Sequence, residues 1–206
     1  MHLVIHWVIV IKYIERKPRI TNNGLFDALS KQYFALIEKI IAENIKYTNI
    51  DRTIQWCFVA HTSPEITATV NRKTNLLSVN IAFIDKEFKE NRIYVIEYFL
   101  LHEMRHISQH IEIEKYKTGD NTISPLFIKR WINEGENYER ALDEQGRENP
   151  NYPKQDNELD AYAFAYAVMH YKYQGMYDSL LYIPKIYNNE LKENFYSAVN
   201  DFLENI

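Results

Sequence analysis

Hydrophobic residues recur at helical spacing between Asn91 and Ile111, and this pattern restricts the possible folds of the chain more than any other feature. The repeating positions are Ile93, Ile96, Leu100, Met104, Ile107 and Ile111. A period of about 3.6 residues predicts an amphipathic helix with one face in the core. Further helices are predicted over residues 25–46, 127–143, 158–173 and 190–204, and β-like runs over 53–60, 66–70 and 76–83. The order of a helix, a small mainly antiparallel sheet and then several helices predicts the α+β class.

The length of the chain favours a single domain. The sequence has 206 residues, which one hydrophobic core can accommodate. No stretch rich in proline, glycine and serine divides the sequence, whereas residues 113–156 are more polar than their neighbours. We therefore predict one helix-rich domain over residues 1–206, with a polar insertion at about 113–156.

The most hydrophobic stretch lies in residues 1–14. Its uninterrupted apolar part runs from Trp7 to Ile11, far short of the roughly 20 residues that a membrane-spanning helix needs. Many of its residues are β-branched, and no small-residue cleavage site follows. These features predict a buried strand rather than a membrane span or a signal peptide. We accordingly expect no membrane association and a cytoplasmic location.

Charge and cysteine content exclude several classes of protein. The 28 acidic and 24 basic side chains give a net charge of -4, whereas dedicated nucleic-acid binders usually carry a basic excess. Cys57 is the single cysteine, so the chain can form neither an internal disulfide nor a multi-cysteine zinc site. A single free cysteine is typical of a reducing compartment.

The predicted helix at 91–111 contains the sequence His102-Glu103-Met104-Arg105-His106, an H-E-x-x-H motif. Histidines at positions i and i+4 lie on one helix face, about 6 Å apart along the axis, and can bind one cation. Glu103 lies about 100° around the helix from His102, so it is not placed to complete the same ligand pair. A carboxylate there can instead accept a proton from the attacking water.

A catalytic zinc site needs a third protein ligand. The metzincin extension of the motif requires glycine and histidine where this chain has Gln109 and Glu112. Without that glycine the helix continues, which places Glu112 about 15 Å and His110 about 12 Å from His102 along the axis. Both are therefore poor candidates for the third ligand.

A second candidate segment runs from Asn157 to Ala165, with the sequence NELDAYAFA. It resembles the E-x-x-A-x-x-F-A helix of gluzincin metallopeptidases, the thermolysin-like class, and the arrangement is most similar to its small single-domain members, the minigluzincins. The resemblance covers roughly residues 54–172. It implies a zincin-like fold and one Zn²⁺ ion held by His102, His106 and Glu158.

The resemblance is incomplete next to Glu158. Many relatives have an acid four residues after the ligand glutamate, where it orients a zinc histidine, and this chain has Tyr162 there. A phenol can still accept a hydrogen bond from an imidazole N–H, although it orients the ligand histidine less strongly than a carboxylate does. Asp160 is an alternative, although it lies on nearly the opposite helix face from Glu158.

The resemblance also implies a substrate and a mode of binding. Relatives pair an extended peptide with an edge strand above the zinc, and Leu76–Phe83 has the position and alternation for this role. The partner is then a peptide or protein substrate. Relatives use a histidine or tyrosine to stabilise the oxyanion, and the candidates in this chain are Tyr162, Tyr166, His170 and His61.

These observations predict a zinc-dependent metallopeptidase with Glu103 as the general base. An alternative is a catalytically inactive binding or regulatory protein on the same scaffold, consistent with Tyr162 and with the polar insertion. A third possibility is a deformylase-like metal hydrolase, which requires a cysteine ligand. Cys57 lacks the glycine-rich surroundings of such a ligand, and we expect it in the core.

Overall fold

The computed structural model describes residues 23–60, 66–120, 123–142, 147 and 149–206. The strand predicted within residues 1–14 and the candidate His61 lie outside these ranges. The chain groups into two compact units, Met1–Glu103 and Met104–Ile206. The boundary falls inside one continuous helix, α4 (Ile93–Lys117). The prediction of a single zincin-like domain stays a prediction.

The first unit contains a three-stranded sheet in the order β1-β3-β2. Its strands are β1 (Trp56–Val59), β2 (Ala68–Asn71) and β3 (Leu76–Asn80). β2 and β3 follow each other in the chain and are antiparallel, whereas β1 pairs with β3 in parallel. The expectation of a mainly antiparallel sheet is therefore wrong, because the chain passes through β2 before β3 returns beside β1. The coarser prediction of a helix-rich α+β fold with a small sheet is confirmed.

The predicted strand at Leu76–Phe83 ends three residues early, and a helix that the sequence analysis did not predict follows it. Asn80 ends β3 and caps helix α3 (Ile81–Lys89): its side-chain oxygen accepts a hydrogen bond from the Ala82 N–H at 3.1 Å. Its amide also donates to the Ile66 carbonyl at 2.7 Å. An asparagine that satisfies a free helix N–H favours helix initiation, so residues 81–83 leave the sheet.

The position of β3 contradicts the predicted mode of substrate binding. β3 is the central strand, and its two edges are occupied by β1 and β2. A central strand has no free row of N–H and C=O groups to offer an extended peptide. The prediction that a substrate pairs with Leu76–Phe83 is therefore wrong.

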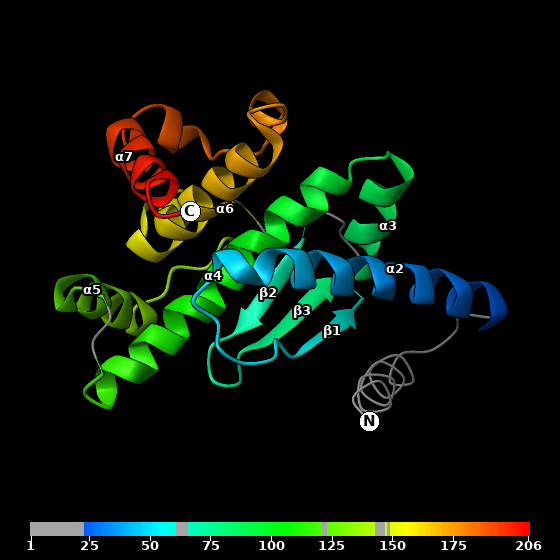
Figure 1. Ribbon diagram of the computed structural model, residues 1–206, viewed down its shortest axis with the longest axis horizontal. Coiled ribbons are helices and arrows are strands. Elements are labelled where there is room, and N and C mark those ends of the chain that lie inside the picture. Colours follow the sequence, from blue (N-terminus) through cyan, green and yellow to red (C-terminus); the bar gives the residue numbers. More distant parts are fainter. Residues whose placement is uncertain (1–22, 61–65, 121–122, 143–146, 148) are drawn as a thin grey trace. The chain divides into compact units, whose positions relative to one another are not determined.

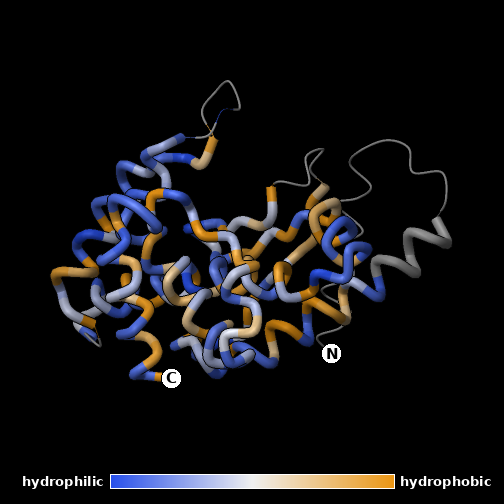
Figure 2. The backbone as a smooth tube through the Cα atoms, turned by 90° about the horizontal axis from the view of Figure 1, so that it is seen from above, coloured by the Kyte–Doolittle hydropathy of each residue, from blue (hydrophilic) through white to orange (hydrophobic). Residues whose placement is uncertain are grey.

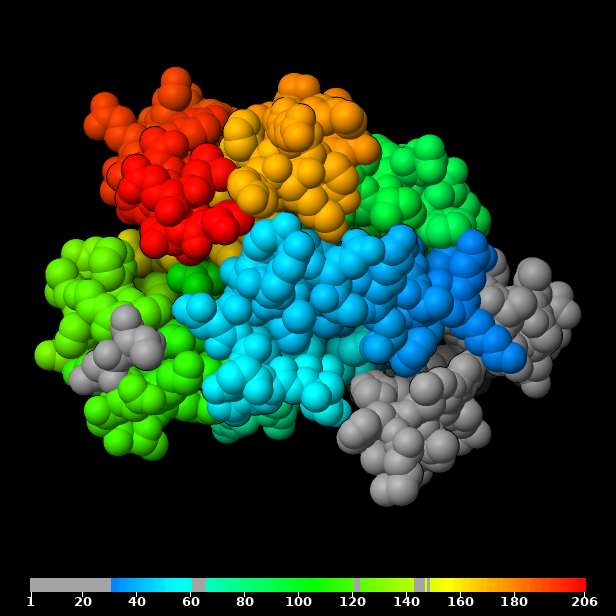
Figure 3. All heavy atoms as spheres, viewed as in Figure 1, coloured from blue at the N-terminus to red at the C-terminus, as the bar shows by residue number. Residues whose placement is uncertain are grey.

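Helix α2 (Asn23–Asn44) lies against the sheet of the first unit, and the short helix η1 (Ile45–Tyr47) follows it (Figure 1). The Phe34 and Trp56 rings stand 4.8 Å apart, and the Trp56 indole donates to Glu38. The opposite side of α2 is open to solvent and forms part of the surface in Figure 3. This helix therefore has the amphipathic character that its sequence predicts.

The second unit consists of the end of α4 and the helices that follow it. These are α5 (Pro125–Glu136), η2 (Tyr152–Lys154), α6 (Asp156–Tyr173), η3 (Asp178–Leu180), η4 (Lys185–Asn188) and α7 (Lys192–Leu203). α6 and α7 pack through aromatic rings, with Phe164 5.4 Å from Phe202 and Tyr166 6.0 Å from Phe195. The predicted helices at 127–143, 158–173 and 190–204 thus all exist, with shifted ends.

Hydrophobic and hydrophilic residues alternate along the helices (Figure 2). α6 is the exception, because buried residues occur on nearly all of its sides, including Ala161, Ala163, Ala165 and Ala167. Small side chains let neighbouring helices approach it closely. Within the ranges that the structure describes, no helix is both long and apolar enough to cross a bilayer.

Candidate metal centre

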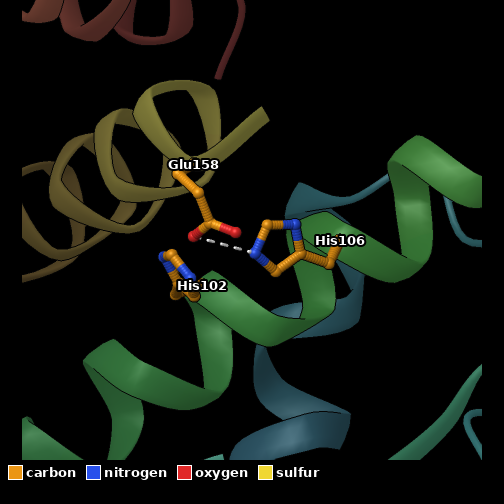
Figure 4. Close-up of side chains that lie close together, drawn as sticks. All are labelled: His102, His106 and Glu158. Carbon is orange, nitrogen blue, oxygen red and sulfur yellow. Dashed lines mark ion pairs between the residues drawn. The ribbon is translucent and has the colours of Figure 1, made fainter. Parts of the chain in front are cut away.

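Helix α4 and the first turn of α6 bring together the residues that the sequence analysis assigned to the metal. His102 and His106 stand one turn apart on α4, and Glu158 projects toward them from α6 (Figure 4). One ligand-type atom from each residue lies within 4.8 Å of the other two. His102 is 2% and Glu158 1% exposed, so solvent contributes little to their environment.

The donor set of this cluster suits a zinc ion, and one pair of its ligand atoms has the spacing of a tetrahedral site. The Nε2 atom of His106 lies 3.5 Å from Oε2 of Glu158. In a tetrahedral site with bonds of about 2.1 Å, neighbouring ligand atoms are about 3.4 Å apart. A buried carboxylate is costly unless a positive charge or hydrogen bonds compensate it, and a cation held among these side chains would add such compensation.

Gln109 contacts the second histidine. Its side-chain oxygen lies 2.8 Å from Nδ1 of His106, on the ring side opposite the atom that faces Glu158. By sequence alone, Gln109 stands out only as a departure from the metzincin pattern. Its spacing of three residues from His106 on one helix face was the signal that could have identified it.

Two tyrosines from the polar insertion approach the candidate third ligand. The Tyr138 hydroxyl donates a hydrogen bond to Oε1 of Glu158 at 3.2 Å. Burial and the nearby charge of Glu158 raise the pKa of Tyr152 well above its ordinary value, so its phenol stays protonated. Neither tyrosine was predicted, because neither belongs to a motif or shares a helix with the ligands.

The start of α6 is held by α5. The Glu134 carboxylate accepts hydrogen bonds from the backbone N–H groups of Asp156 and Asn157, at 2.6 and 2.9 Å. Burial raises the pKa of Glu134 even though these two donors favour its ionised form. A carboxylate at a helix N-terminus satisfies free N–H groups and the helix dipole, and here it fixes the turn that carries Glu158.

The predicted general base Glu103 is buried on α4, next in sequence to His102. Tyr162 packs in an aromatic cluster, 6.2 Å from the Tyr182 ring and 5.8 Å from the Tyr187 ring. Its assignment to oxyanion stabilisation stays a prediction, as does the catalytic role of Glu103.

His170 and Tyr166 are not brought to the cluster. They follow Glu158 on the same helix by about 18 and 12 Å along the axis. The His170 Nδ1 atom lies 2.7 Å from Asp178, and Tyr166 and Asp178 both line a separate cavity of about 390 Å³. The expectation that either residue assists at the metal is corrected, because a continuous helix holds them too far from Glu158.

The remaining candidates also lie outside the cluster. Cys57 is buried in β1, where burial raises the pKa of its thiol, in line with the predicted core position. Glu112 is buried further along α4 and accepts a hydrogen bond from Lys115 at 3.3 Å. Asp160 binds Arg105 and Gln109. Among the described residues, only His102, His106 and Glu158 form a group able to hold a metal ion.

Comparison of the chain with protein-family models, with curated proteins and with solved structures finds no match in any of the three.

Proposed function

We propose that this chain is a zinc-dependent metallopeptidase with a zincin-like site, in which His102, His106 and Glu158 hold one Zn²⁺ ion. The observation that carries the proposal is the buried cluster of two imidazoles and one carboxylate, with its ligand atoms within 4.8 Å of one another. The H-E-x-x-H sequence supports it, since this motif supplies both the paired histidines and a neighbouring carboxylate.

The residues of the site suit hydrolysis of a peptide bond. A bound zinc ion supplies Lewis-acid polarisation of a carbonyl and lowers the pKa of water toward about 7. Glu103 takes a proton from the attacking water and delivers it to the leaving amine. The single negative charge of Glu158 leaves the occupied site with net positive charge, which favours the negative charge that develops on the carbonyl oxygen.

The metal part of the proposal is tested by zinc content. Mass spectrometry of the purified protein is expected to find about one zinc ion per chain, and Glu158→Gln is expected to lose it, because an amide is a much weaker zinc ligand. Glu112→Gln is the matched control, since it makes the same change at another buried glutamate of the second unit. Equal zinc content in the folded wild type and Glu158→Gln overturns the ligand assignment.

The catalytic part is tested with Glu103→Gln. This variant is expected to fold and to bind zinc as the wild type does. It is expected to cleave a fluorogenic peptide library about 10²–10⁴-fold more slowly, because the general base is lost. Cleavage at the wild-type rate excludes Glu103 as the base. A wild type that binds zinc without cleaving any member of the library favours the alternative, a binding or regulatory protein on this scaffold.

A further inference from the structure

The side-chain amide of Gln109 has only one orientation that satisfies its neighbours. Its nitrogen, Nε2, donates to the Asn157 carbonyl at 2.9 Å and to Oδ2 of Asp160 at 2.6 Å. A carbonyl and a carboxylate can only accept hydrogen bonds. Rotating the amide by 180° would place its oxygen against both acceptors, so Oε1 must be the atom that faces His106.

This orientation decides which nitrogen of His106 carries hydrogen. Oε1 of Gln109 is an acceptor 2.8 Å from Nδ1 of His106, so Nδ1 must donate. A neutral imidazole has one N–H and one lone pair. The lone pair is then on Nε2, the atom 3.5 Å from Glu158.

The acceptors that fix Gln109 are themselves held in place. Arg105 binds Asp160 through two hydrogen bonds, Nε to Oδ2 at 2.7 Å and Nη2 to Oδ1 at 3.1 Å. The guanidinium carbon lies 5.6 Å from the Phe164 ring and 4.9 Å from the Phe202 ring. A forked ion pair enclosed by aromatic rings has little freedom to rearrange.

We infer that Gln109 is a positioning residue that fixes His106 with Nδ1 protonated and Nε2 available to a metal. Asp160, paired with Arg105, fixes Gln109 in turn. The support that the sequence analysis sought at Tyr162 therefore comes from an amide of α4 backed by a carboxylate of α6. A hydrogen bond that fixes the tautomer of a ligating histidine typically contributes a factor of about 10–100 in metal affinity.

The tautomer itself is measurable without a metal or a substrate. Long-range ¹H–¹⁵N NMR correlations of histidine-labelled protein distinguish Nδ1–H from Nε2–H in a neutral imidazole. The His106 signal is identified by its loss in His106→Gln. We expect the Nδ1–H form in the wild type. Observation of the Nε2–H form overturns the inference.

The consequence for binding rests on the proposed function, and Gln109→Met tests it. This variant keeps the length of the side chain and removes the amide, and its Kd for zinc is expected to rise about 10–100-fold. Asn44→Leu is the matched control. Asn44 is also buried, at 0% exposed against 2% for Gln109, and its amide binds Ile40 and Glu97 of the first unit rather than His106.

The control should retain the wild-type Kd, whatever its loss of thermal stability. If wild type and Gln109→Met bind zinc equally well, the positioning role is refuted while the zinc site stands. If the wild type binds no zinc, the proposed function fails, and the tautomer measurement still decides the role of Gln109.

Discussion

The hydrogen bond between Tyr33 and Asp85 shows how a single contact couples stability to pH. The Tyr33 hydroxyl donates to Oδ1 of Asp85 at 2.7 Å. Burial, with help from Asp85, raises the pKa of Tyr33 to about 12. Partial burial opposes ionisation of Asp85, but hydrogen bonds from Lys89 and Tyr33 outweigh it and lower the pKa of this carboxyl.

These shifts give opposite pH dependences at the two ends of the scale. The stability from Asp85 is present above its unfolded pKa of about 3.9 and is lost as pH falls through its lower folded pKa. The stability from protonated Tyr33 is present below its unfolded pKa of about 10 and is lost as pH rises through its folded pKa of about 12.

Tyr33→Phe is therefore expected to lower the free energy of unfolding at pH 7 by about 1 kcal/mol, because one partly buried hydrogen bond is lost. The difference between wild type and variant should shrink between about pH 10 and 12, where the wild type loses the same bond. Urea unfolding across this range measures both effects. A difference that stays constant up to pH 12 contradicts the assignment.

At the scale of elements, α4 and α6 are joined by a largely buried ion pair between Arg105 and Asp160. The side chains of Arg105 and Asp160 are only 10% and 20% exposed. Removing one partner of such a pair leaves a charge without compensation in a poorly solvated site. Removing Asp160 is therefore expected to cost more stability than the loss of its hydrogen bonds alone, because Arg105 is left without a counter-charge.

Asp160→Ala is expected to destabilise the second unit by about 3 kcal/mol, at the lower end for a buried pair because Asp160 retains some solvent contact. Asp156→Ala is the control on the same helix. Asp156 pairs with Arg130 at 3.3 Å, with side chains 44% and 52% exposed, and such surface pairs contribute about 0.5 kcal/mol. If thermal unfolding shows that Asp160→Ala and Asp156→Ala lose equal stability, other groups compensate the charge of Arg105.

The turn after α6 depends on a glycine in the left-handed region. Gly175 has φ +76°, and a Cβ there would lie 3.3 Å from Oδ2 of Asp178 and 3.5 Å from Cε1 of His170. Gly119 has φ +88° with nothing within 4 Å of its Cβ position. A side chain at either glycine would therefore strain the backbone, but only a side chain at Gly175 would also meet a close neighbour.

Alanine at either glycine is expected to cost about 1 kcal/mol through the positive φ. Gly175→Ala should cost measurably more than Gly119→Ala, because Oδ2 of Asp178 must shift by a few tenths of an ångström to admit the methyl group. Comparison of the two free energies of unfolding isolates the contact. A smaller loss for Gly175→Ala would contradict the tight geometry of this turn.

At the scale of the whole molecule, zinc binding is expected to stabilise the fold, because only the folded chain brings Glu158 to the histidines. Free zinc at about 1,000 times its Kd stabilises a protein by about 4 kcal/mol. For a chain of this size, that corresponds to a rise in Tm of about 10 °C. Thermal unfolding with zinc and with a chelator measures the shift, and Glu158→Gln should show none. A shift of the same size in that variant would mean that zinc binds elsewhere.

Prediction of the fold from the sequence succeeded where the periodic signal was long. The helices at 91–111 and 158–173 correspond to α4 and α6. It failed at residues 81–83, where β-branched and aromatic residues continue the strand pattern but the side chain of Asn80 starts a helix. It also assigned β3 to an edge, because strand order depends on pairing partners that no local pattern encodes.

The sequence by itself determined the spacing of His102 and His106, because the geometry of one helix fixes residues at i and i+4. The resemblance proposed Glu158, but only the tertiary structure brings it to within 3.5 Å of His106. The tertiary structure alone also decided which amide atom of Gln109 faces the ring, through acceptors on α6. Local spacing is set by backbone geometry, whereas contacts between distant segments are set by packing, and the orientation of a side chain by the hydrogen bonds that packing leaves available.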